Sequence, residues 1–276
     1  MRFVMFSKML KRTGGLSVDE AGDRIAKLGF DGVDLTVRPG GHVAPEDASQ
    51  QLSGAIETFR SKGLSVPMIT TGITDADEEY AEDIFAVADA EDVEYLKLGY
   101  WYYDGFGSIH EGCDSMREDL EGIRELSTEY DVTPAVHTHS GDFLSANPAM
   151  LWSVLRDGKP EDLGIYVDPG HLVAEGSLSG WEMNLDLVRD YVAMVSIKDF
   201  GWSREQKNGE VEWMEDWVPL GEGLVPWDRV FDRLDAIGFD GPVSVHSEYG
   251  NLDLEGLIDQ TREDVEYLDG IVERRP

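Results

Sequence analysis

Histidines gather at the ends of short apolar segments in this chain of 276 residues. Five of the six histidines hold such a position: His42, His137, His139, His171 and His246. Glu248 follows the last of them by two residues. Imidazole and carboxylate side chains transfer protons near neutral pH and bind divalent metals, so these positions are candidates for both kinds of chemistry.

Pairs of polar residues occur at a spacing of two, which on a strand places both side chains on one face. The pairs are His137 with His139, His246 with Glu248, and Ser196 with Lys198. A lysine that ends an apolar strand is costly to bury without a partner. Lys198 is therefore either paired with Asp168 or Asp199, or a catalytic cation that holds substrate oxygens and stabilises an enolate.

These side chains need elements to position them, and the chain supplies alternating strand and helix patterns from end to end. We expect strands near 2–7, 31–37, 64–70, 93–99, 132–138, 163–168, 192–199 and 242–248. We expect helices near 17–28, 45–62, 75–90, 111–130, 147–157, 180–190, 227–237 and 253–270. Eight such units predict a (β/α)8 TIM barrel, an α/β fold, as one domain over 1–276. A doubly wound open sheet is the alternative, but its glycine-rich fingerprint does not follow the first strand.

Aromatic residues mark two of the loops after these strands. Trp101 lies in the run 99–104 after the fourth strand, and Trp202 lies in the segment 200–225 after the seventh. We expect both tryptophans at the rim, where they would pack on a sugar. A loop as long as 200–225 is typical of a lid, although it could equally cover the barrel edge with a satellite core.

Composition narrows the setting and the partners. The 23 basic and 56 acidic residues give a formal net charge of −33, which favours a protein adapted to a salty, halophilic cytoplasm. That charge argues against a nucleic-acid partner. The single cysteine, Cys113, suits a reducing cytoplasm. The N-terminal apolar run is too short for a signal peptide, and no stretch reaches the roughly 20 apolar residues of a membrane span, so we expect no membrane association.

Six motifs together resemble the xylose isomerase-like barrel superfamily of sugar phosphate isomerases and epimerases. They are 29–35, 136–141, 168–171, 197–200, 219–223 and 238–245, and they cover nearly the whole chain. The stretches 38–42 and 68–72 look like those of an uncharacterised subgroup. The resemblance implies a divalent metal held by carboxylates and a histidine at the ends of strands five to eight.

Carried over residue by residue, the resemblance makes Asp168 a metal ligand and His171 a substrate contact. His137 and His246 stand where the family has glutamates, and Ser196 stands where it has a histidine. His137, Asp168 and His246 would still form a two-histidine, one-carboxylate set that suits Mn, Fe or Zn. In the absence of a metal, Lys198 would supply the positive charge.

The sequence therefore predicts a sugar isomerase or epimerase that removes a proton next to a carbonyl. Glu248 or His139 would act as the base, with a metal or Lys198 stabilising the enediolate. Arg38, His42, His171 and the two tryptophans would contact a small sugar-like substrate, which we expect to be unphosphorylated because cations are few there. The alternatives are a dehydratase or other lyase on a keto-inositol-like compound and a non-catalytic sugar-binding protein. A DNA-repair endonuclease of the same fold is disfavoured by the charge. A homo-oligomer is compatible with the sequence.

Overall fold

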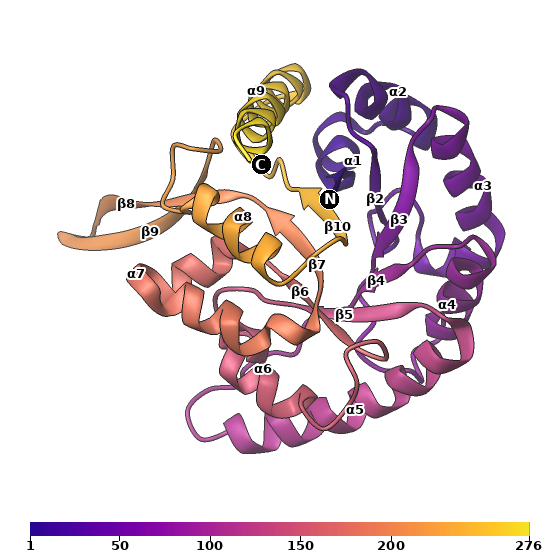
Figure 1. The fold of residues 1–276 in the computed structure, drawn as a ribbon, viewed down its shortest axis with the longest axis horizontal. Helices are drawn as coiled ribbons and strands as arrows, with labels where there is room; N and C mark the ends of the chain where they lie inside the picture. Colours follow the sequence, from indigo (N-terminus) through magenta and orange to yellow (C-terminus); the bar gives the residue numbers. More distant parts are fainter. Residues whose placement is uncertain (276) are drawn as a thin grey trace.

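Eight parallel strands close into a barrel in the computed structural model, which describes residues 1–275 (Figure 1). The barrel strands are β1 (Arg2–Phe6), β2 (Gly32–Thr36), β3 (Ser65–Thr70), β4 (Tyr95–Lys97), β5 (Thr133–His137), β6 (Gly164–Val167), β7 (Val192–Ile197) and β10 (Pro242–Val245). Their order around the barrel follows the chain, and β10 closes it by pairing with β1. This confirms the predicted single-domain TIM barrel.

The helices form a ring outside the strands, as Figure 1 shows. The α-helices are α1 (Lys8–Gly14), α2 (Val18–Leu28), α3 (Ala48–Ser61), α4 (Ala81–Ala90), α5 (Ile109–Tyr130), α6 (Pro148–Leu155), α7 (Pro169–Val188), α8 (Trp227–Ala236) and α9 (Leu254–Glu273). Short 3-10 helices are η1 (Pro45–Asp47), η2 (Leu144–Ala146) and η3 (Arg189–Tyr191). No helix within residues 1–275 combines the length and apolar character needed to cross a membrane.

Helix ends lie where local chemistry places them. The Ser17 side chain accepts a hydrogen bond from the Glu20 backbone N–H, and the Glu20 carboxylate accepts one from the Ser17 backbone N–H, so α2 opens with a capping box. The Asn147 side chain caps α6 ahead of Pro148. Gly29 ends α2 in the left-handed region at φ 88°, where a side chain would be strained. These sequence patterns therefore set the strand-to-helix junctions.

The barrel strands are buried on both faces, as parallel strands covered by helices must be. Outward-facing residues pack against the helices in one continuous core. Inward-facing residues form a second, smaller cluster: Val4, Met68, Ala135, Tyr166 and Met194. Further along the strands, toward their carboxyl ends, inward-facing side chains become polar, beginning with Asp34, Thr70, Lys97 and His137. The change from apolar to polar layers places the chemistry at one end of the barrel.

The segment after β7 is a β-hairpin, so the predicted loop over 200–225 is wrong for most of its length. Strands β8 (Asp199–Lys207) and β9 (Glu210–Val218) pair antiparallel over nine residues and extend beyond the helix ring at the left of Figure 1. Asn208 and Gly209 form the turn, with φ of 54° and 85°. Both positive values match the turn that suits the twist of paired strands, and Asn-Gly favours it.

Two helices also differ from expectation. Helix α1 occupies residues where no helix is predicted, and Gly15, the residue after its last turn, adopts φ 64°. Helix α7 begins at Pro169 rather than near 180, with non-helical backbone at Ser177. Pro169 follows the Asp168 cap, so the turn that carries His171 is the first turn of this helix. Asp168 and His171 are thereby fixed relative to one another.

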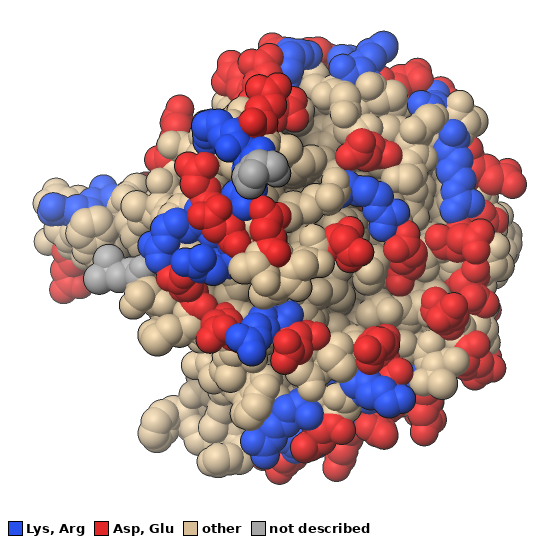
Figure 2. Space-filling view, viewed as in Figure 1, with Lys and Arg blue, Asp and Glu red and all other residues tan. Residues whose placement is uncertain are grey.

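Charged side chains of both signs cover the face shown in Figure 2, with acidic groups spread around it rather than gathered in one patch. Much of the basic complement on the surface is paired with acids, for example Arg24 with Glu255 and Arg233 with Glu182. Such exposed pairs each contribute little stability. The excess negative charge is therefore a property of the whole surface.

Candidate active site

The three predicted catalytic residues line one cavity of about 440 Å³ at the carboxyl ends of the barrel strands. His139 follows β5, Lys198 follows β7 and Glu248 follows β10. The hairpin contributes two more lining residues, Glu215 and Trp217. The strand order around the barrel is β10, β7, β6, β5, so Lys198 after β7 lies between Glu248 after β10 and His139 after β5. The cavity thus combines a cation with groups that can transfer protons on either side of it.

Lys198 is held by two carboxylates. Its Nζ lies 3.4 Å from Oδ2 of Asp168 and 3.2 Å from Oε2 of Glu248, and its side chain is nearly fully buried. Burial alone would lower the pKa of Lys198, but attraction from Asp168 and Glu248 outweighs it and raises that pKa. The predicted alternative of a pair with Asp199 is wrong. The lysine is therefore a fixed positive charge at neutral pH.

Asp199 has a different task. Its Oδ1 accepts hydrogen bonds from the backbone of Phe200 and Val225, and its Oδ2 accepts one from Nε1 of Trp227 at 3.0 Å. Gly223 lies so close to this carboxylate that an added Cβ would fall 2.1 Å from Oδ1. Asp199 thus connects the segment 219–227 to the end of β7 by hydrogen bonds, at the point where the hairpin begins.

Asp168 is the centre of the buried part of the site. Its Oδ2 lies 3.3 Å from Nε2 of His137 and 3.6 Å from Nε2 of His171, in addition to Lys198. Burial would raise the pKa of Asp168, but Lys198 and the two histidines reverse that effect and hold it well below its ordinary value. Burial lowers the pKa of both histidines, so their neutral forms are favoured. His171 lies beneath the mouth, where Oγ of Ser140 contacts its Nδ1 at 2.7 Å.

His139 is oriented as a base. Its Nδ1 lies 2.8 Å from the carbonyl oxygen of Ser140 and must donate there, because a carbonyl can only accept. Its Nε2 therefore carries the free lone pair. Burial, followed by repulsion from Lys198, lowers the pKa of His139 to about 4. Its ring centroid lies 3.9 Å from that of His171.

Glu248 faces two ammonium groups. Its Oε1 accepts a hydrogen bond from Nζ of Lys8 at 2.6 Å, and its Oε2 faces Lys198. Burial would raise the pKa of Glu248, but Lys198, His246 and Lys8 together lower it well below its usual range. Glu248 is therefore an ionised carboxylate that positions Lys198 and lines the cavity.

The predicted metal ligands do not converge in the structure. Nε2 of His246 is 2.8 Å from the hydroxyl of Tyr166, and its ring stacks on Phe6 with centroids 4.3 Å apart. The rings of His137 and His246 are 6.2 Å apart, and Lys198 occupies the space beside Asp168. Within residues 1–275, no three His, Cys, Asp or Glu side chains are arranged to hold one ion. His137, Asp168 and His246, as the structure places them, do not form a three-ligand site for the expected Mn, Fe or Zn.

The predicted substrate contacts divide. Trp101 points away from the mouth, because it is buried and its Nε1 donates to Oδ2 of Asp119 on α5 at 2.7 Å, so its predicted place at the rim is wrong. Trp202 lies on the hairpin beyond Phe200 and is half exposed. Arg38 lies near enough to influence Asp34 electrostatically. His42 is partly buried and is not among the residues that line the cavity.

Sequence reasoning missed several residues of the polar interior. Asp34 is fully buried and accepts hydrogen bonds from Oγ1 of Thr70 at 2.7 Å and Oγ of Ser244 at 2.8 Å. Lys97 and Tyr100 follow it around the barrel on β4 and in the next loop. The spacing rule that revealed His137 and His139 would also have marked Lys97, two residues after the inward-facing Tyr95.

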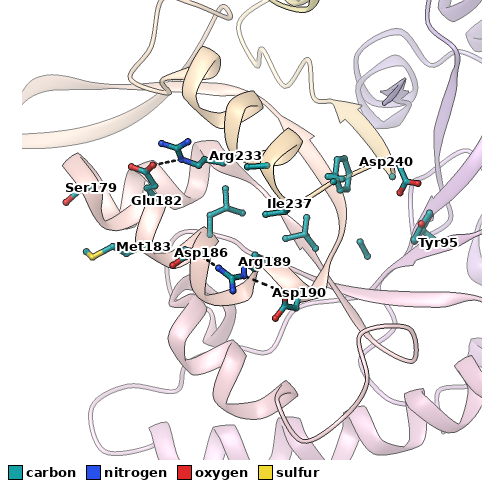
Figure 3. Close-up of a pocket in the computed structure, with 17 residues that line it drawn as sticks. Tyr95, Ser179, Glu182, Met183, Asp186, Arg189, Asp190, Arg233, Ile237 and Asp240 are labelled. Carbon is teal, nitrogen blue, oxygen red and sulfur yellow. Dashed lines mark hydrogen bonds and ion pairs between the residues drawn. The ribbon is translucent and has the colours of Figure 1, made fainter. Parts of the chain in front are cut away.

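A second cavity, of about 830 Å³, lies at the opposite end of the barrel, among the amino ends of β4, β7 and β10 and the helices α7 and α8 (Figure 3). Its cations are paired: Arg233 with Glu182, and Arg189 with Asp186 and Asp190. Function in a TIM barrel resides at the carboxyl ends of the strands, so this cavity is not the candidate site.

Comparison with known proteins identifies the fold family. A family model described as a xylose isomerase-like TIM barrel matches residues 23–271. Solved structures with the same fold include a D-tagatose 3-epimerase-like protein, with 18% identity, 99% of each chain covered and a TM-score of 0.69. The 3-keto-D-glucoside 4-epimerase YcjR from E. coli has 14% identity, covers 98% of this chain and 99% of its own, and has a TM-score of 0.70. An L-ribulose 3-epimerase has 13% identity, covers 99% of this chain and 95% of its own, and has a TM-score of 0.71. No curated protein sequence matches the chain.

Proposed function

Because this chain belongs to the xylose isomerase-like TIM barrel family, we propose that it is a sugar isomerase or epimerase acting on a small, unphosphorylated, polyhydroxylated carbonyl compound. The observation that carries the proposal is the ammonium of Lys198, fixed between Asp168 and Glu248 in a cavity that His139 also lines. The structural similarity to a D-tagatose 3-epimerase-like protein, a 3-keto-D-glucoside 4-epimerase and an L-ribulose 3-epimerase supports the same reaction class.

The proposed reaction begins with the substrate carbonyl oxygen at Nζ of Lys198. Glu248 or His139 takes the proton from the neighbouring carbon. The electron pair of that C–H bond forms a C=C bond to the carbonyl carbon, and the π pair of the C=O bond moves onto the carbonyl oxygen. Lys198 stabilises the resulting enediolate by its positive charge in a partly desolvated site. Return of a proton to the opposite face gives an epimer, whereas return to the adjacent carbon gives an isomer.

The placement of the two proton-transfer groups favours epimerisation. Epimerisation requires groups on both faces of the reacting carbon, and Glu248 and His139 come from strands on either side of Lys198. Trp217 lies 4.4 Å from Nζ of Lys198, measured to the ring centroid, and gives the cavity an apolar wall. His171 supports His139 from below, so it acts as a positioning residue rather than a substrate contact.

A divalent metal is not needed for this sequence of steps, because Lys198 supplies the charge at the carbonyl oxygen. Direct metal analysis tests the prediction of Mn, Fe or Zn at His137, Asp168 and His246. We also propose that the protein works at high salt, which would screen its net charge of −33.

The test is solvent-proton exchange. The purified chain is incubated in D2O at molar salt with unphosphorylated ketoses, including D-tagatose, D-psicose, D-fructose and L-ribulose, and with a 3-keto-glucoside. We expect stereospecific deuterium incorporation next to the carbonyl of at least one of them, followed by nuclear magnetic resonance. Lys198→Met and Glu248→Gln should abolish it, and Trp101→Phe should not. Absence of exchange and of new products across the panel would contradict the proposal.

A further inference from the structure

Lys97 is a buried amine that the proposed reaction does not use. It ends β4 between Thr70 of β3 and Ala135 of β5, and only 2% of the residue is exposed. Its side chain enters the polar layer of the barrel interior. Among residues 1–275, its Nζ has no hydrogen-bond partner and forms no ion pair. Nζ lies over the aromatic ring of Tyr100, 3.6 Å from the ring centroid.

The charges around Lys97 disfavour a second ammonium there. Arg38, Lys8 and Lys198 all repel it, and Asp34 is the carboxylate that attracts it. Asp34 is already engaged by two hydroxyl groups, and burial raises its own pKa, which weakens it as a counter-charge. Burial, aided by the repulsion, lowers the pKa of Lys97 well below its usual value. The neutral amine is therefore favoured, and its N–H groups face the Tyr100 ring.

A neutral amine is a nucleophile, and Lys97 lies in the polar layer of the barrel interior, beneath the Tyr100 ring. We propose that Lys97 forms an imine with an aldehyde or ketone that enters the barrel mouth. The lone pair of Nζ adds to the carbonyl carbon and gives a carbinolamine. The former carbonyl oxygen then leaves as water, taking the two hydrogens of the amine, and a C=N bond replaces the C=O bond. No oxidant or further reactant is required.

Tyr100 controls access to this amine. The residue lies in the loop after β4, is partly exposed, and its hydroxyl is 3.2 Å from Nδ1 of His137. The ring covers Nζ of Lys97, so the ring must turn aside before a carbonyl carbon can approach. The inference rests on the proposed function only for the carbonyl class of ligand, since imine formation needs no turnover.

The test is reductive trapping on the full chain. The protein is incubated at neutral pH and high salt with glycolaldehyde or dihydroxyacetone and sodium cyanoborohydride, and the adducts are mapped by peptide mass spectrometry. Exposed Lys27 and Lys159 serve as internal references. We expect Lys97 to react at least about tenfold faster than either, because an ordinary lysine near neutral pH is almost entirely protonated. Unfolding in urea should abolish the preference, and Lys97→Arg should leave only the reference adducts.

Tyr100→Ala separates access from reactivity. This variant should react at Lys97 faster than the wild type, since the ring no longer covers Nζ. A Lys97 adduct no more abundant than those at the reference lysines, in both the wild type and Tyr100→Ala, overturns the inference. Deuterium exchange without a Lys97 adduct would overturn this inference alone. An adduct without exchange on any sugar would instead count against the proposed epimerase or isomerase.

Discussion

Lys198 and Lys97 are both buried in the barrel interior, but their surroundings shift the pKa values of the two lysines in opposite directions. On the side of β6, β7 and β10, two ionised carboxylates flank Lys198 and raise its pKa. On the side of β2, β3 and β4, Lys97 lies against an aromatic ring, and its pKa is lowered. The comparison teaches that depth does not decide the state of a buried lysine, because the available counter-charge does.

This division gives the two sides different chemistry. A fixed ammonium stabilises a developing oxyanion without giving up its proton, as the proposed reaction requires of Lys198. A neutral amine can attack a carbonyl carbon, as we infer for Lys97. The two lysines would thus react differently with a carbonyl ligand, because Lys198 would stabilise charge on its oxygen, whereas Lys97 would replace that oxygen with nitrogen.

The largest expected effect follows from removing the paired charge. Lys198→Met should lower kcat/KM by about 10³-fold, because the oxyanion loses its stabilising charge. It should also destabilise the fold by about 3–5 kcal/mol, since the fully buried Asp168 would lose its ammonium partner, although Glu248 would keep Lys8. Steady-state kinetics and urea unfolding measure the two effects, with Lys198→Arg as the control that retains the charge. A loss in kcat/KM below tenfold would break the assignment of Lys198.

The histidines extend the comparison to pH. Burial, aided by Lys11, lowers the pKa of His42 to about 4 from an ordinary 6.5, so between those values the unfolded chain binds more protons than the folded one. The free energy of unfolding should therefore be greatest above pH 6.5 and fall as pH drops toward 4. His42 alone should account for about 3 kcal/mol at most. The free energy of unfolding, measured with urea at several pH values between 7 and 4, should fall less steeply with decreasing pH for His42→Gln than for the wild type. Equal slopes for the wild type and His42→Gln would refute this.

Much of the fold could be predicted because its signals are local. The alternation of apolar segments with capped helices located all eight barrel strands, and the two-residue spacing at their ends brought His139, Lys198 and Glu248 to one cavity. The hairpin was missed although Asn208-Gly209 announces a tight turn between strands. Its strands carry many charged residues, which hid the alternation that buried strands display.

The parts that failed depend on contacts distant in sequence. Trp101 follows a barrel strand as a rim residue would, but its partner, Asp119, lies on the next helix and draws the ring outward. Whether Lys198 pairs with Asp168 or Asp199 depends on where α7 begins and on the loop after the hairpin, which forms hydrogen bonds with Asp199. Lys97 differs from Lys198 chiefly in its counter-charges, and the two carboxylates that hold Lys198 follow other strands, β6 and β10.

A smaller effect is expected from removing the unpaired amine. Lys97→Met should leave the free energy of unfolding unchanged or raise it by up to about 1 kcal/mol, because a buried amine without a partner gives way to a side chain of similar length. The methionine sulfur can keep a favourable contact with Tyr100. Urea unfolding beside Lys198→Met makes the contrast direct. A loss of 3 kcal/mol or more would mean that Lys97 is a charged, paired lysine like Lys198.

The smallest effect is expected from removing metal ions. Because Lys198 lies 3.2–3.4 Å from both carboxylates, the positive charge at the mouth is part of the chain itself. Dialysis against EDTA should therefore change the exchange rate by less than about twofold, since the charge that stabilises the enediolate stays in place.

Metal content is measured alongside by inductively coupled plasma mass spectrometry, for wild type and His246→Ala. One equivalent of metal that is lost together with activity in His246→Ala would show that a metal and Lys198 share Asp168. In that case a metal, together with Lys198, would stabilise the oxyanion, and the comparison with Lys97 would no longer be one between two lysines alone.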